Sequence, residues 1–94
     1  MNNLNSILIE GVVKSLSETG NDFVLRLKRK KKSRDSFIDV LVELTDAVRQ
    51  LEAVKHLSIK DYVRVVGHLD HPETGGDGLV VVAEHLERRG FKRV

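Results

Sequence analysis

The stretch that decides the fold reads Phe23-Val-Leu-Arg-Leu-Lys-Arg-Lys-Lys-Lys-Ser-Arg-Asp-Ser-Phe-Ile-Asp-Val-Leu-Val-Glu-Leu44. Side-chain character alternates with a period of two over residues 23–28 and again over residues 37–44. A period of two indicates a strand with one buried face. The two halves are therefore predicted to be strands, joined by a basic loop at residues 29–35.

Positive charge is concentrated at the centre of this stretch. Seven of the nine residues from Arg26 to Arg34 are Lys or Arg. The chain has 16 basic residues, so nine lie outside this segment. Together with the 14 acidic residues, they give the rest of the chain a net charge of −5. Such clusters bind nucleic-acid backbones, because each neutralised phosphate releases a counterion. A solvated loop is the alternative, but it would carry self-repulsion without benefit. The predicted phosphate-binding residues are Arg26, Lys28, Arg29, Lys30, Lys31, Lys32 and Arg34.

The rest of the chain supplies three more strands and one helix. Residues 5–13, 62–69 and 79–86 are rich in β-branched and apolar side chains and are predicted to be strands. From Leu44 apolar residues recur at helical spacing, which predicts one helix of about three turns, capped by Thr45 or Asp46 and ending before Ser58.

Three strands, a helix and two strands follow one another in the order of the OB-fold, a five-stranded Greek-key β-barrel with a helix between strands 3 and 4. An SH3-like barrel is less suitable, because it does not need the helix. The predicted fold class is therefore all-β with one helix. We expect a single OB-fold domain over residues 1–90 and a short basic C-terminal tail at residues 91–94.

Several classes of site and location are disfavoured by composition. The absence of Cys excludes disulfides, thiol nucleophiles and Cys-ligated zinc. Neither a signal peptide nor a membrane-spanning segment is recognisable, so we expect a cytoplasmic protein. The histidines nearest to a metal motif, at residues 68–71, lack ligand spacing. No nucleophile–base motif or phosphate-binding glycine loop appears, and residues 75–78 are predicted to be a hairpin turn. We therefore expect no enzyme, no metal, no cofactor and no small-molecule substrate.

Several segments, in the right order, resemble the bacterial single-stranded DNA-binding protein family. They are Asn5–Gly11, Phe23–Arg29, Ser36–Val40, Asp61–Leu69 and Val82–Leu86. In length the chain is also similar to a tail-less relative, the primosomal replication protein of the n type, which is a dimer with the same barrel. The resemblance implies an OB-fold that binds single-stranded DNA without sequence preference in DNA replication, recombination and repair, in the bacterial cytoplasm and associated with the nucleoid.

The resemblance also indicates which residues contact bases. Lysines stand where the family has a stacking Trp or Tyr after the second strand, and two further aromatic positions of the family fall at Glu43 and near Thr74. Phe37 alone therefore keeps a stacking position. Phe37 is on the strand face opposite Val40 and is predicted to be exposed, where stacking contributes about 1–3 kcal/mol per base. Packing under the loop or in a subunit contact is the alternative. Tyr62 and Arg64 share an outward face and are predicted to extend the groove, or to form an ordinary solvated face.

The first strand has apolar residues on both faces, with a glycine, Gly11, that indicates a bend. An exposed apolar strand calls for a partner, and in the family this strand helps to form the dimer. We therefore expect a homodimer or homotetramer. The predicted interface residues are Ile7, Leu8, Ile9, Glu10 and Val12.

A second hypothesis, from a different class, is an OB-fold protein-interaction adaptor of the primosome type. Its main partner would be another replication or repair protein, and its contact with nucleic acid would be secondary. The missing stacking residues favour this hypothesis, and the dense basic segment argues against it.

Overall fold

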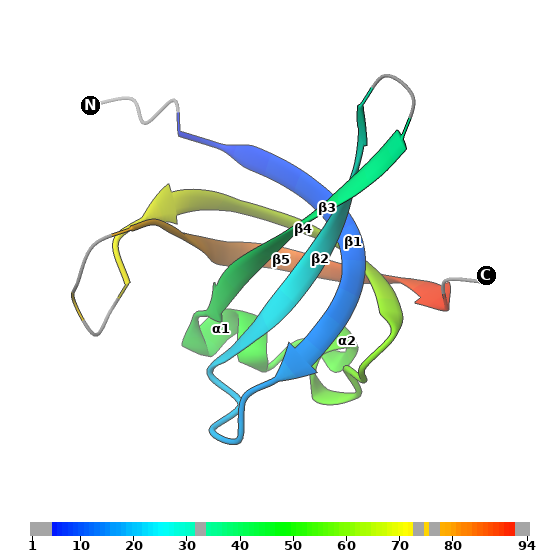
Figure 1. Ribbon diagram of the computed structural model, residues 1–94. Helices are drawn as coiled ribbons and strands as arrows, with labels where there is room; N and C mark the ends of the chain where they lie inside the picture. Colours follow the sequence, from blue (N-terminus) through cyan, green and yellow to red (C-terminus); the bar gives the residue numbers. More distant parts are fainter. Residues whose placement is uncertain (1–4, 32–33, 73–74, 76–77, 92–94) are drawn as a thin grey trace.

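Five strands form a closed barrel in the order β1-β2-β3-β5-β4 in the computed structural model, which describes residues 5–31, 34–72, 75 and 78–91 (Figure 1). The strands are β1 (Ile7–Leu16), β2 (Asp22–Lys31), β3 (Arg34–Leu44), β4 (Asp61–Asp70) and β5 (Val80–Phe91). Neighbouring strands are antiparallel except β3 and β5, which are parallel. The five-stranded OB-fold barrel predicted from the sequence is confirmed.

The basic segment is largely strand, so the prediction of a loop over residues 29–35 is wrong. β2 continues to Lys31 and β3 begins at Arg34, and these two residues are the last pair of an uninterrupted ladder. Along this ladder Lys28 is paired in register with Phe37, and the backbone of Lys30 with that of Asp35. A cation opposite an aromatic or acidic residue is a favourable cross-strand pair. The result is a long two-stranded ribbon that projects past β1 (Figure 1).

The fifth strand is also longer than predicted. β5 runs to Phe91 instead of ending at Leu86, because β4 offers pairing partners along its whole length, down to Asp61 opposite Phe91. The strand therefore continues past Gly90, where the domain was predicted to end. Residues 92–94 of the predicted tail lie outside the described residues.

The prediction of a single three-turn helix is wrong. The chain forms two four-residue helices, α1 (Asp46–Arg49) and α2 (Glu52–Lys55), with Leu51 extended between them. Thr45 caps α1 as expected: its hydroxyl oxygen accepts a hydrogen bond from the backbone N–H of Val48. A helix of this length is stabilised mainly by packing, and here Val48, Leu51 and Val54 all pack against the core. Tertiary contact therefore overrides the helical periodicity.

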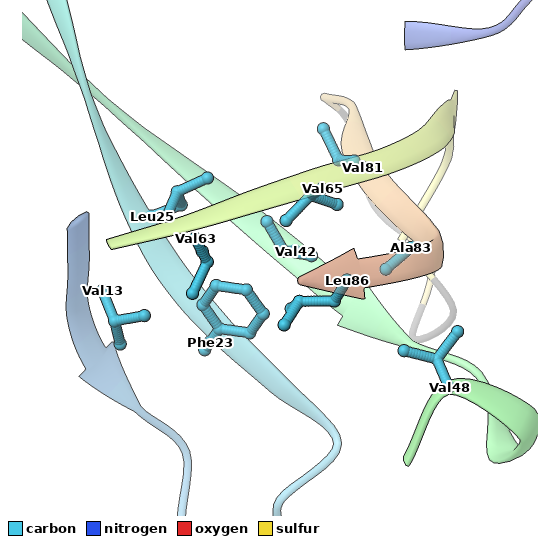
Figure 2. Packing of buried hydrophobic residues seen from close by; sticks show 10 residues of the cluster. All are labelled: Val13, Phe23, Leu25, Val42, Val48, Val63, Val65, Val81, Ala83 and Leu86. Atoms are coloured by element: carbon cyan, nitrogen blue, oxygen red, sulfur yellow. The ribbon is translucent and has the colours of Figure 1, made fainter. Parts of the chain in front are cut away.

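The core is built from the inward residues of all five strands and one residue of α1. Figure 2 shows these side chains converging around Phe23. Phe23, Leu25 and Val42 are fully buried, as the alternation along residues 23–44 predicts. The buried hydrophobic cluster comprises Val13, Phe23, Leu25, Val42, Val48, Val63, Val65, Val81, Ala83 and Leu86.

An ion pair between a buried carboxylate and a partly exposed arginine, which sequence reasoning missed, lies at the start of β4. Asp61 is completely buried, and its carboxylate lies 3.1 Å from Nε of Arg88. The same carboxylate accepts a hydrogen bond of 2.9 Å from the backbone N–H of Ser58. A buried charge of this kind is tolerated only when it is paired and hydrogen-bonded. Asp61 therefore holds the turn before β4 in one conformation.

The first strand changes its partner near its middle. Residues 7–12 pair with β4, whereas residues 12–16 pair with β2. At this junction a Cβ atom added to Gly11 would lie well under 3.0 Å from the carbonyl oxygen of Arg26. Only glycine allows the two backbones to approach so closely.

We expect Gly11→Ala to destabilise the fold by about 1–3 kcal/mol, because the new methyl group meets backbone that cannot move without disturbing the barrel. Urea unfolding followed by circular dichroism measures the change. Ser15→Ala, at an exposed position of the same strand, is the control. Equal stability of the two variants would contradict the close approach at Gly11.

Candidate nucleic-acid interface

A hollow of about 440 Å³ lies where the β2–β3 ribbon leaves the barrel. The hollow arises because β1 pairs with β2 only as far as Val12 opposite Arg26. Beyond Arg26, β2 has β3 as its neighbour on one side and no partner from β1 on the other. The hollow is lined by Glu10, Gly11, Val12, Arg26, Lys28, Phe37, Lys60 and Tyr62.

Two aromatic side chains and three cations therefore share one concave surface. Phe37 is 59% exposed, so its predicted exposure is confirmed. The Arg26 guanidinium lies over the Phe37 ring, 5.6 Å from the ring centroid, which is within the range of a cation–π contact. The contact presents an aromatic face and a positive charge together, a combination that suits a base and its neighbouring phosphate.

Part of the positive charge is already paired within the chain. Asp39 binds Arg26 through Nε at 2.9 Å and is also bound by Nζ of Lys14. Hydrogen bonds, first from Arg26 and then from Lys14, lower the pKa of the Asp39 carboxyl to about 2, and Asp39 in turn raises the pKa of Arg26. This carboxylate therefore favours the folded state above pH 3.8, and that contribution is lost as the pH falls through about 2.

The predicted phosphate-binding residues divide between the two faces of the ribbon. Arg26 and Lys28 point to the side of the hollow, and Lys28 lies 3.2 Å from Asp35. Strand alternation puts Arg29 and Arg34 on the opposite face. Both are exposed, and among the described residues neither has an ion-pair partner.

Three of the predicted cations are described only in part or not at all. The backbones of Lys30 and Lys31 belong to β2. Lys32 lies outside the described residues. A ribbon with basic residues on both faces is nevertheless clear from the register, since residues 26 and 28 alternate with residue 29 along β2.

Tyr62 and Arg64, although neighbours on one strand face, occupy different environments. Tyr62 pairs with Val12 and lines the hollow. Arg64 is partly buried, with Nη2 at 3.3 Å from Oε1 of Glu10, and its Nε is buried without a hydrogen-bond partner among the described residues. The structure thus brings Tyr62 into the site and ties Arg64 to Glu10 beside it.

Two further cations near the site were missed by sequence reasoning. Lys60 lines the hollow, and Lys14 completes the pair of cations around Asp39. Neither lies in a charged run, so composition gave no signal. Lys60 precedes β4 in a turn, so strand alternation gave no signal for it either.

The residues predicted for an oligomer interface do not form one surface. Ile7 and Ile9 pack against the core from inside the barrel. Leu8 is 58% exposed on the outer face, whereas Glu10 and Val12 line the hollow. The outer face of β1 therefore belongs partly to the candidate nucleic-acid site.

In the histidine cluster at residues 68–71, the contacts of His68 are with single carboxylates. His68 lies 3.7 Å from Asp70 and 3.4 Å from Glu84, and the side chain of His71 contributes no third ligand. Within the described ranges no group of three or more potential ligand residues could hold a metal ion. In the same part of the chain no helix has the length and apolar character that crossing a bilayer would take.

Comparison with known proteins places the fold. No protein-family model and no curated protein sequence matches the chain. Among solved structures, the mitochondrial single-stranded DNA-binding protein Rim1 of S. cerevisiae has a TM-score of 0.69 and 10% identity, over 97% of this chain and 100% of that one. The small single-stranded DNA-binding protein of Streptomyces coelicolor has a TM-score of 0.65 and 21% identity, over 94% of each chain.

A third similar structure is the protein priB from Ralstonia solanacearum, with a TM-score of 0.67 and 11% identity, over 93% of this chain and 100% of that one. At these identities the likeness establishes the fold. The resemblance drawn from the sequence, including its tail-less primosomal type, is thereby confirmed at the level of architecture: the chain has the OB-fold shared by small single-stranded DNA-binding proteins.

Proposed function

We propose that this protein binds single-stranded DNA without sequence preference, in DNA replication, recombination or repair. The observation that carries the proposal is Phe37, which is 59% exposed beneath the Arg26 guanidinium at the base of a basic ribbon. A large aromatic ring left open to water beside cations is suited to stacking against an unpaired base. The fold shared with single-stranded DNA-binding proteins supports the same function.

Charge and stacking have separate tasks in this mechanism. Lys28 on one face of the ribbon and Arg29 and Arg34 on the other attract phosphates, so a flexible strand can pass around the ribbon. Phe37 then stacks on a base that is not paired. A duplex keeps its bases stacked inside, so it gains only the phosphate contacts.

We expect a steep dependence of affinity on salt, with each ribbon cation contributing about 0.7 to the slope of log K against log salt. Replacing Lys28, Arg29, Lys30 and Lys31 by Gln should flatten that slope. Phe37→Leu is the matched variant: it should weaken binding by about 1–3 kcal/mol and leave the slope unchanged. Fluorescence anisotropy of a labelled oligonucleotide at several salt concentrations measures both. A flat slope for the native protein, or equal affinity for duplex, would contradict the proposal.

The Asp39 carboxylate occupies the place that a phosphate would take between Lys14 and Arg26. Asp39→Asn should therefore tighten binding several-fold and steepen the salt slope by up to about 1.4, because two cations become available. Glu18→Gln, which changes the net charge equally in the β1–β2 turn, is the control. If Asp39→Asn binds no more tightly than this control, the carboxylate does not compete with phosphate.

We further propose that the protein is a homodimer or homotetramer. Leu8 is 58% exposed and pairs with Val66, so both side chains point outward on one sheet face. Leu8→Glu should shift sedimentation equilibrium toward the monomer, whereas Leu79→Glu, at another exposed leucine, should not. A native protein that is monomeric at micromolar concentration would end this proposal.

A further inference from the structure

Lys60 has an unusual backbone conformation. Its φ is +79°, and it is the one residue other than glycine with positive φ in the part of the chain that the structure describes. The left-handed region suits glycine or asparagine and disfavours a long side chain such as lysine. The conformation is enforced from both sides: the Lys60 N–H donates to the carbonyl oxygen of Val13 at 2.9 Å, and the following residue is the buried Asp61. Strained positions of this kind gather at functional sites.

The strained residue lies at the candidate nucleic-acid site. Lys60 lines the hollow together with Arg26 and Lys28 of the ribbon, and Tyr62 and Phe37 supply aromatic surface there. Glu10 also lines the hollow, but its carboxylate is bound by Arg64 at 3.3 Å, which offsets its repulsion of an anion. The volume of about 440 Å³ falls within the roughly 300–1,000 Å³ typical of small-ligand sites.

Aromatic rings, an apolar wall at Val12 and three cations at one hollow match the parts of a nucleotide. We propose that the hollow is a defined subsite for one nucleobase of the bound strand, with Tyr62 and Phe37 contacting the base and Lys60 contacting its phosphate. The proposal rests on the proposed single-stranded DNA binding and adds to it: one nucleotide enters a fixed place, while the ribbon holds the rest of the strand loosely.

Lys60→Gly separates the role of the side chain from that of the backbone. Glycine accepts positive φ, so the variant should be at least as stable to urea as the native protein. Its affinity for an oligo(dT) strand should nevertheless fall several-fold, with the salt slope reduced by about 0.7. Lys60→Asn should behave like Lys60→Gly. Lys55→Gln, which removes a charge outside the hollow, is the control and should bind like the native protein.

Tyr62 provides a direct reporter, because it is the single tyrosine of a chain without tryptophan. Saturating oligo(dT) should quench the intrinsic tyrosine emission, whereas an abasic deoxyribose-phosphate strand of equal length should bind more weakly and quench little. Two results together would overturn the subsite alone: oligo(dT) binds the native protein without changing its tyrosine emission, and it binds Lys60→Gly as tightly as the native protein. Native protein that binds no oligo(dT) would overturn the proposed function itself.

Discussion

The change of partner by β1 at Gly11 and Val12 is the constraint on which the site depends. The barrel closes only because β1 pairs first with β4 and then with β2, and Gly11 lets the backbones come close enough to do so. The same change leaves the outer half of β2 without β1 beside it. The ribbon therefore projects from the barrel (Figure 1). The hollow lies where the ribbon leaves β1 and is lined by residues of both. The strand pairing that closes the barrel therefore also forms the site.

The ribbon combines attraction for anions with internal restraint. Lys28 is held by Asp35, and Arg26 and Lys14 by Asp39, so the cations beside Phe37 stay oriented in the absence of a ligand. Exposed ion pairs of this type contribute little to stability. These ion pairs instead set how strongly a phosphate must compete with Asp35 and Asp39 for the cations. Arg29 and Arg34, on the other face, have no such restraint from the described residues.

One sheet face serves two proposed contacts. Glu10 and Val12 of β1 pair in register with Arg64 and Tyr62 of β4. A second copy of the chain that covered this end of β1 would also cover the hollow. Leu8 and Val66, farther along the same two strands, are a surface that a second copy could cover while the hollow stays open. Oligomerisation and DNA binding are compatible only if the interface is confined to that end.

The sequence by itself determined the element order, the inward faces of the strands and the concentration of positive charge, because period-two alternation and composition are local properties. It predicted that Phe37 is exposed, and it did so from alternation alone. Only the tertiary structure decided the length of the ribbon, the break at Leu51, and the meeting of Lys60, Tyr62 and Phe37 at one hollow. These features depend on cross-strand register and on packing between residues far apart in the chain, for which neighbouring residues carry no signal. The strained Lys60 and the buried Asp61 were decided by the same closure of the barrel.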